Sequence, residues 1–190
     1  MADDILGVTL EVAQALEQAG VPYSVGGSLA SGFSGMPRFT LDVDIAVLLR
    51  SNQIELFASS LGPEYYVDVG AIERAVRQRS SVNLIHRPTN IKVDLFVIEP
   101  DGPMAMQVVR RQGRQLTEDA RSVVYFHSHE DILLQKLRWF RDGGEVSERQ
   151  WRDVLAIARV QAASLDREYL RHQAVVLGVH DLLMRLVDEA

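Results

Sequence analysis

Two short stretches decide the fold: residues 25–28 read Val-Gly-Gly-Ser, and residues 41–48 read Leu-Asp-Val-Asp-Ile-Ala-Val-Leu. The second stretch has the alternation and apolar content of a buried β-strand. The first places two glycines where a short strand over residues 21–25 should pass into a helix over residues 28–34, which Gly35-Met36-Pro37 ends. We therefore expect a strand–turn–helix unit followed by a strand that carries acids.

The rest of the chain is predicted from the same periodicities. Up to about residue 100, helices and strands alternate, with helices expected over 4–19, 54–61 and 71–78 and strands over 65–69, 81–86 and 92–99. Residues 104–126 suggest a short helix with one or two strands, and the chain from Glu130 onward is helical, with a capping box at 147–150. We predict an α/β (α+β) fold, in which a mixed sheet flanked by helices (1–126) is followed by a helical C-terminal part packed on it (127–190).

Bulk composition restricts the class of protein. A chain of 190 residues with 47% hydrophobic content suits one compact domain, or one with a short helical addition. A net charge of −6 argues against nonspecific coating of nucleic acid, and the lack of cysteine excludes disulfides, thiolate metal sites and cysteine nucleophiles. Acidic residues begin the chain where a signal peptide needs basic ones, and no apolar run suits a membrane span. We expect a cytoplasmic protein with no membrane partner.

Two acids interrupt the strand over residues 41–49. Asp42 and Asp44 are two residues apart, so they project from the same face, about 7 Å apart along the strand. Ala46 and Leu48 continue that face, and the other face is apolar, so we expect both acids to be largely buried. Neighbouring buried carboxylates need a compensating cation, and hard divalent cations such as Mg²⁺ take oxygen ligands. Alternatively, these acids cap turns or lie at a solvated strand end; the pair alone favours neither reading.

A third acid lies on a later apolar strand. Asp94 shares its face with Phe96 and Ile98, which is a poor environment for an unpaired charge. It could simply form an ion pair with Lys92 or with an arginine. Three acids on two apolar strands are nevertheless better explained by one shared cation site. Calcium-loop and zinc sites are disfavoured, because the chain lacks the ligands that either requires near these acids.

The turn Gly26-Gly27-Ser28 suits an anion. Glycines let the backbone approach a phosphate closely, the amides at a helix N-terminus favour negative charge, and a serine hydroxyl can donate to the same phosphate. The turn is not a Walker A loop, because the Gly-Lys-Ser/Thr ending is missing. Taken alone, a Gly-Gly turn between a strand and a helix is a weak signal.

Together, the order of these motifs resembles the polymerase-β-like nucleotidyltransferase superfamily, over residues 21–100. Within it, the chain is similar to the AbiEii-type and MenT-type bacterial toxin group and its uncharacterised relatives. Residues 37–42, Pro-Arg-Phe-Thr-Leu-Asp, are similar to the Arg-x-Thr-x-Asp-x-Asp lead-in of that group. The segment from Gln135-Lys136-Leu137-Arg138-Trp139 to Arg152-Asp153 is similar to its second cluster, a lysine followed by an arginine-aspartate pair.

The resemblance implies a Mg²⁺- or Mn²⁺-dependent transfer of a nucleoside monophosphate from an NTP to an acceptor hydroxyl. The implied metal ligands and catalytic residues are Asp42, Asp44 and Asp94, with Asp94 also serving as general base. The implied nucleotide-binding residues are Gly26, Gly27, Ser28, Arg38 and Lys136. The acceptor would be an RNA end, a protein or a small molecule.

The resemblance favours a tRNA or protein acceptor, and a toxin that has an antitoxin partner. One alternative is a non-catalytic nucleotide-binding or regulatory member of the same fold. Another is a nucleotide-sugar glycosyltransferase, which also uses an Asp-x-Asp motif with a metal. A glycosyltransferase would not predict the Gly-Gly-Ser turn or Asp94.

Helical positions further along leave alternatives open. Lys136 lies on the apolar stripe of its helix with Ile132 and Phe140, so its ammonium must either reach water or meet a fixed anion, such as a triphosphate. Asp153 is spaced to pair with Arg149 one turn earlier.

The remaining candidates receive structural readings. Trp139 and Trp151 occupy core-like helical positions and are assigned to packing, and His127 and His129 are read as structural or surface residues. Two arginine clusters could contact RNA, although a solvated face is the simpler reading: Arg74, Arg77 and Arg79, and Arg110, Arg111 and Arg114.

Overall fold

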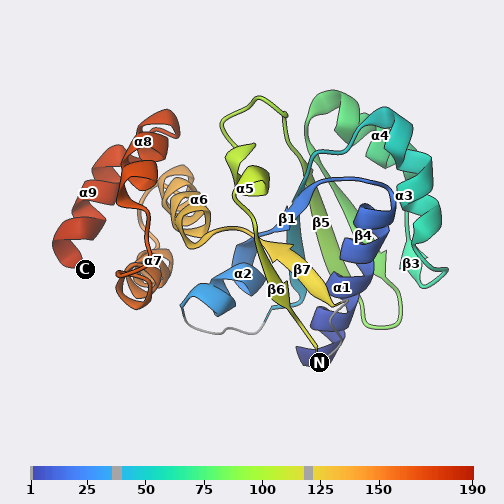
Figure 1. Ribbon diagram of the computed structural model, residues 1–190, viewed down its shortest axis with the longest axis horizontal. Helices are drawn as coiled ribbons and strands as arrows, with labels where there is room; N and C mark the ends of the chain where they lie inside the picture. The colour runs from blue at the N-terminus through green and yellow to red at the C-terminus, as the bar shows by residue number, and fades with distance from the viewer. Residues whose placement is uncertain (1, 36–39, 118–121) are drawn as a thin grey trace.

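The computed structural model describes residues 2–35, 40–117 and 122–190 (Figure 1). Within these ranges, seven strands form one mixed sheet in the order β3-β4-β5-β2-β1-β7-β6. The strands are β1 (Tyr23–Val25), β2 (Asp42–Val47), β3 (Tyr65–Tyr66), β4 (Ser81–His86), β5 (Ile91–Val97), β6 (Gln112–Gln115) and β7 (Val123–Phe126). The α/β fold with a mixed sheet is therefore confirmed.

The centre of the sheet brings together segments that lie far apart in the sequence. β2 runs parallel to β5 and antiparallel to β1, and β4 runs antiparallel to β5. The turn over residues 87–90 joins β4 to β5 as predicted. The register pairs Asp44 with Asp94 and Asp42 with Lys92, so the acids of the two strands lie on one face.

The opposite face of the sheet carries the main hydrophobic core. Three helices cover it, namely α1 (Ala2–Gln18), α3 (Ile54–Ser60), which follows the 3-10 turn η1 (Ser51–Gln53), and α4 (Val69–Gln78). Val43, Ile45 and Val47 alternate with the acids of β2 and are completely buried on this side. A strand with one apolar face against helices thus leaves its other face for polar chemistry.

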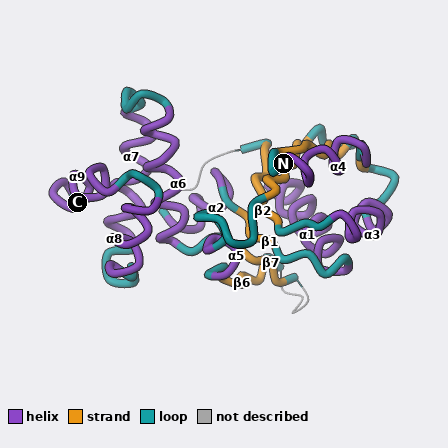
Figure 2. The backbone as a smooth tube through the Cα atoms, turned by 90° about the horizontal axis from the view of Figure 1, so that it is seen from above, coloured by secondary structure: helices purple, strands orange, loops and turns teal. Residues whose placement is uncertain are grey.

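The acid-bearing face is covered only in part. α2 (Gly27–Ser34) and the short α5 (Met106–Val109) pack near β2, and a small apolar cluster of Ala46, Ile98 and Val108 joins α5 to the sheet. Next to α2 lies α6 (His129–Asp142) (Figures 1 and 2).

The C-terminal helices form a bundle at one end of the molecule, away from α3 and α4 (Figure 2). They are α6, α7 (Glu148–Val160), α8 (Arg167–Val176) and α9 (His180–Glu189). The hydroxyl of Ser128 caps α6 and that of Ser147 caps α7 at the predicted position, while the Asp166 carboxylate caps α8. Trp151 is buried and its ring lies 5.3 Å from that of Phe140, which confirms its packing role.

The elements differ from the prediction at β3. The strand expected over 65–69 is confirmed only at Tyr65–Tyr66, because pairing ends there and a helix begins at Val69. The carboxylate of Asp68 accepts a hydrogen bond from the Ala71 amide and so caps that helix. In the described part of the chain, every helix falls short of the length and apolar character that crossing a membrane requires.

Candidate functional site

The turn between β1 and α2 lies directly against Asp44. The Gly26 amide donates to the Asp44 carbonyl at 2.8 Å, and Gly27 adopts φ +60. A Cβ on Gly27 would overlap the Asp44 carboxylate, and a Cβ on Gly26 would come within 2.7 Å of His127 Nε2. A side chain is therefore excluded at both positions, because the backbone of Gly27 lies close to Asp44 and that of Gly26 lies close to His127.

The first turn of α2 lacks a side-chain cap among the described residues, and Gly26 is its N-cap residue. The free amides at such an end, together with the helix dipole, attract negative charge. Ser28 is half-buried in this first turn. Arg38, which was predicted to assist here, lies outside the described residues.

The three acids differ in exposure. The side chain of Asp42 is 57% exposed and that of Asp94 is 15% exposed, while Asp44 is half-buried. The expectation that Asp42 is buried is wrong, because it is the first residue of β2 and the preceding Leu41 is also exposed. Asp44 lies one pleat further in, where it meets both Asp94 and Gly27.

The charge balance of the acids centres on Asp44. Burial raises its pKa to about 6, and the neighbouring charges of Asp94 and Asp42 add to this rise. Lys92 and Lys136 oppose it, so the structure brings Lys136 of α6 into the electrostatic environment of Asp44. Asp44 is therefore mostly ionised at pH 7 but takes up a proton as the pH falls toward 6, and a bound cation would stabilise its charged form.

Lys92 provides part of that cationic charge. Its Nζ donates to Asp94 Oδ2 at 2.8 Å and lies 3.9 Å from Asp42 Oδ1, and the hydrogen bond to Asp94 raises the pKa of Lys92. The ion pair considered for Asp94 is therefore formed. Among the described residues, no group of three histidine, aspartate or glutamate side chains is arranged to hold a metal by itself.

Lys136 meets a fixed anion rather than water. It is 8% exposed, and its Nζ lies 3.3 Å from Asp153 Oδ2 on α7. The pairing of Asp153 with Arg149 that its spacing suggested is replaced by this contact between helices. The packing of α6 on α7 thus brings together the lysine and the aspartate of the predicted second cluster.

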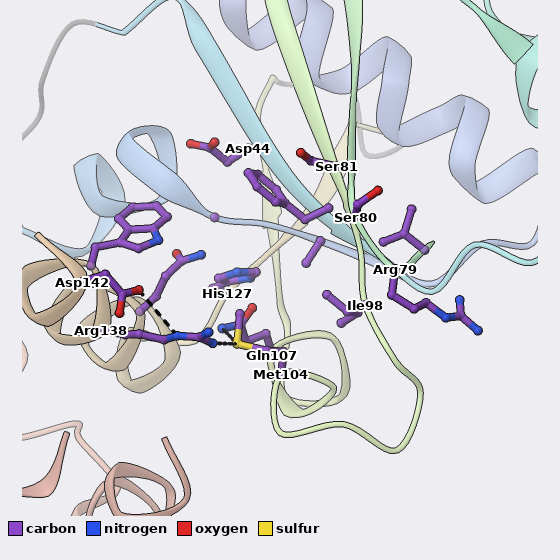
Figure 3. A pocket seen from close by; sticks show the side chains of 16 residues that line it. Asp44, Arg79, Ser80, Ser81, Ile98, Met104, Gln107, His127, Arg138 and Asp142 are labelled. Atoms are coloured by element: carbon purple, nitrogen blue, oxygen red, sulfur yellow. Dashed lines mark hydrogen bonds and ion pairs between the residues drawn. The ribbon is translucent and has the colours of Figure 1, made fainter. Parts of the chain in front are cut away.

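A cavity of about 350 Å³ opens beside Asp44 and Gly26. In the view of Figure 3, Asp44 lies at one end, Met104 and Gln107 lie at the other, and His127 lies between them. Sheet residues such as Phe96 form one wall, and α6 forms another through a stripe with helical spacing: Gln135, Arg138, Trp139 and Asp142. This volume is near the lower end of the range for small-molecule sites.

Sequence reasoning missed two residues of this cavity. Trp139 was assigned to packing, but it is 36% exposed and lines the cavity, so that assignment is wrong. Gln107 received no role, yet it is buried at the cavity wall. The helical stripe that carries Trp139 was visible in the sequence, but a tryptophan on such a stripe is usually a core residue.

His127 is structural, as predicted, and it also lines the cavity. It is buried, its Nδ1 forms a hydrogen bond with the hydroxyl of Ser24, and burial lowers its pKa to about 3. The imidazole is therefore neutral at physiological pH. His129 is part-buried, with its Nδ1 2.8 Å from the Ser34 hydroxyl.

The arginine clusters are largely engaged in the fold. Arg110 lies over the ring of Tyr169 at 3.8 Å and within 3.7 Å of Glu130, and Arg111 lies over Tyr125 at 4.5 Å. Arg79 pairs with Glu99 at 3.0 Å and borders the cavity. These contacts favour a structural reading of both clusters over RNA binding.

Comparisons with known proteins identify the fold. No protein-family model matches the sequence, and neither does any curated protein. The structure is similar to a nucleotidyltransferase-like protein from Paracoccidioides brasiliensis, with a TM-score of 0.54, 17% identity, and coverage of 97% of this chain and 92% of that one.

The antibiotic-resistance factor ANT(2'')-Ia is similar in two structures. Its solution structure has a TM-score of 0.56 and 14% identity, with 100% of this chain and 99% of that one covered. Its crystal structure with adenylyl-2''-tobramycin has a TM-score of 0.51 and 10% identity, with 92% and 97% covered. Identities this low establish the fold alone, and the chain has the fold of nucleotidyltransferases.

Proposed function

We propose that this chain is a nucleotidyltransferase, which moves a nucleoside monophosphate from an NTP to an acceptor hydroxyl and releases pyrophosphate. One observation carries the proposal: the Asp44 carboxylate, beside Asp94, lies against Gly27 at the uncapped N-terminus of α2 and lines one end of a cavity. An anion-binding helix end next to acids is the arrangement that a metal-bound triphosphate requires. The fold supports the same activity.

The cation would be Mg²⁺ or Mn²⁺, which Asp42, Asp44 and Asp94 would hold together with the phosphates of the nucleotide. The raised pKa of Asp44 reflects its burial first, and then the negative charge of Asp94 and Asp42, which the lysines balance only in part; carboxylate oxygens are the ligands that these cations prefer. Mg²⁺ is usually held by one or two carboxylates together with substrate phosphates, so a complete protein cage is not needed. When bound, the cation neutralises charge on the transferred phosphate and on the leaving pyrophosphate.

The chain's own groups hold the triphosphate. The amide of Gly27 and the hydroxyl of Ser28 donate to the phosphates at the start of α2, beside Gly26, and Arg38 and Lys136 add positive charge. Asp153, at 3.3 Å from Lys136, keeps the lysine side chain in place.

Asp94 accepts the proton of the acceptor hydroxyl. The acceptor oxygen then bonds to the α-phosphorus, the bond from that phosphorus to the bridging oxygen breaks, and its electron pair leaves with pyrophosphate. Lys92 donates to Oδ2 of Asp94 at 2.8 Å, so Oδ1 is the oxygen that we assign to the proton transfer.

The acceptor is proposed only by class. A small-molecule acceptor is supported by the similar fold of ANT(2'')-Ia, whose crystal structure contains adenylyl-2''-tobramycin. A tRNA or protein acceptor, and a toxin role with an antitoxin partner, rest on the sequence resemblance of residues 37–42 and of the lysine and arginine-aspartate cluster.

A second candidate is a nucleotide-binding regulatory protein without turnover. The ion pair between Lys92 and Asp94 favours it, because the lysine already supplies charge where a cation would bind. One assay separates the two candidates. The protein is incubated with each labelled NTP, Mg²⁺ and total RNA or cell extract, beside Asp44→Asn, which keeps the side-chain shape but loses the charge.

For the enzyme we expect labelled product from the wild type and none from Asp44→Asn. Equal labelling by both proteins would contradict the proposal. Binding of MgATP by the wild type without any product would favour the regulatory protein.

A further inference from the structure

A second cavity lies in the C-terminal helical bundle, among α7, α8 and α9, at the end of the molecule away from α3 and α4 (Figures 1 and 2). Its volume is about 480 Å³, and it shares no lining residue with the cavity beside Asp44. We term it the bundle groove. Five leucines give it an apolar lining: Leu133, Leu165, Leu170, Leu183 and Leu186. A molecule bound there would leave the site of the proposed transfer reaction open.

Exposed side chains of α9 extend this apolar lining to the surface. Met184 is 40% exposed and Val187 is 60% exposed, and both line the bundle groove. They are three residues apart, so they lie on one face of the helix, next to the buried Leu183 and Leu186. An apolar surface that continues from a groove to the outside, with charged residues around it, is typical of an interaction site.

The charged side chains that line the bundle groove are arginines. Arg159 comes from α7 and Arg167 and Arg171 come from α8, and among the described residues no aspartate or glutamate lines the groove. Arg159 donates to the Glu189 carbonyl at 2.8 Å. The guanidinium groups of Arg167 and Arg171 are exposed and have no hydrogen-bond or ion-pair partner in the described part of the chain. This positive charge stands out in a chain whose net charge is −6.

The spacing of the two unpaired arginines indicates the shape of the occupant. Arg167 and Arg171 are four residues apart, so they lie on one face of α8 with roughly 6 Å between their Cβ atoms. Their charge is spread along the helix, whereas a ligand with a single anionic head would engage only one of them. A second helix can present acidic side chains at the same spacing. Helices that dock in apolar grooves also insert apolar side chains at positions i, i+4 and i+7, which suits the leucine lining.

We propose that the bundle groove binds an amphipathic helix of a partner protein, whose apolar stripe enters the groove and whose acidic side chains pair with Arg167 and Arg171. The net negative charge of the rest of the chain repels an acidic partner, so these arginines determine where such a partner can dock. Charge complementarity then supplies specificity and a faster association, and the apolar contacts supply affinity.

Three labelled helical peptides test the charge preference of the groove. They share leucines at positions i, i+4 and i+7 and carry glutamate, glutamine or lysine at the flanking positions. In anisotropy titrations with the full chain, the glutamate peptide should bind about tenfold more tightly than the glutamine peptide, because each exposed ion pair contributes a factor of a few. The lysine peptide should bind most weakly, and the differences should shrink as salt is added.

Reversing the charge of α8 is the decisive variant. Arg167→Glu combined with Arg171→Glu should invert the order, so that the lysine peptide binds most tightly. Both side chains are exposed, and an acid at position 167 lies in the first turn of α8, where it is favourable, so the fold should be kept. The matched control is Arg74→Glu with Arg77→Glu on α4, which makes the same change in net charge outside the groove and should keep the wild-type order.

The apolar part of the groove is tested separately. Met184→Ser combined with Val187→Ser shortens two exposed side chains, so the melting temperature should change little. All three peptides should then bind several-fold more weakly while their order stays the same, because the lost contacts are apolar.

Three results would overturn the proposal. The first is equal affinity for the three peptides, or an order that the charge reversal of α8 leaves unchanged. The second is binding of dodecanoate that Arg171→Glu abolishes, with no binding of any peptide, which would assign the groove to an acyl anion. The third is a dimer in sedimentation that Val187→Ser disperses, which would show that a second copy of this chain covers the groove.

Discussion

At the scale of single residues, the raised pKa of Asp44 makes the free energy of unfolding depend on pH. Burial and two neighbouring acids raise its pKa to about 6, so the folded protein binds a proton at Asp44 more tightly than the unfolded chain does, whose value is near 3.8. Because the folded state holds the extra proton, Asp44 lowers the free energy of unfolding as the pH rises from about 4 through 6. The residue that the proposed reaction needs is thus unfavourable to the fold when its charge is not compensated.

Asp44→Asn should therefore stabilise the protein at pH 7.5 without divalent cations. We expect a gain of about 1–2 kcal/mol, after allowance for solvent screening at a half-buried group, and little gain at about pH 3, where the carboxyl is mostly protonated in both the folded and the unfolded state. Urea unfolding in chelator across this pH range measures the difference. A gain that is the same at both pH values would show that the charge of Asp44 is not its cause.

At the scale of elements, the turn from β1 to α2 depends on Gly27. Its φ of +60 is a left-handed conformation, and a Cβ there would overlap the Asp44 carboxylate. Gly144, after α6, also has a positive φ of +76, but nothing lies within 4 Å of its Cβ position. Both glycines therefore adopt a left-handed backbone conformation, but only Gly27 is in close contact with another residue.

Gly27→Ala should destabilise the protein by about 3 kcal/mol or more, because strain and overlap add together. Gly144→Ala should cost only about 1 kcal/mol, for the backbone conformation alone. Chemical denaturation of both variants gives the comparison. If both variants lost the same free energy of unfolding, Asp44 would be able to move away from the turn without cost. The close contact between Gly27 and Asp44 would then not contribute to stability.

At the scale of the whole molecule, the C-terminal helices share one hydrophobic core with the sheet, which extends from Ile5 to Leu186. Polar contacts add to this junction. The Gln161 side-chain amide donates to the Ser34 carbonyl at 3.1 Å, and the Gln173 side-chain amide donates to the Pro103 carbonyl at 2.8 Å. The predicted boundary at residue 127, between an α/β core and a helical C-terminal part, stays a prediction.

A continuous core predicts one cooperative unfolding transition. Both tryptophans lie in α6 and α7, so their fluorescence reports the helical part, while hydrogen exchange of β2 and β5 amides reports the sheet. We expect the two signals to give the same free energy of unfolding. A helical part that unfolds at lower denaturant than the sheet would instead show two independent units.

The sequence by itself determined the strand with alternating acids, the glycine turn before a helix, the mixed sheet and the cap at Ser147. These features arise from local periods and backbone preferences, which a few neighbouring residues specify. Only the tertiary structure decided that Asp44 meets Asp94 and Gly27, that Lys92 pairs with Asp94, and that Trp139 and Gln107 border one cavity. Those contacts join segments far apart in the chain, and their geometry depends on how the sheet and helices pack.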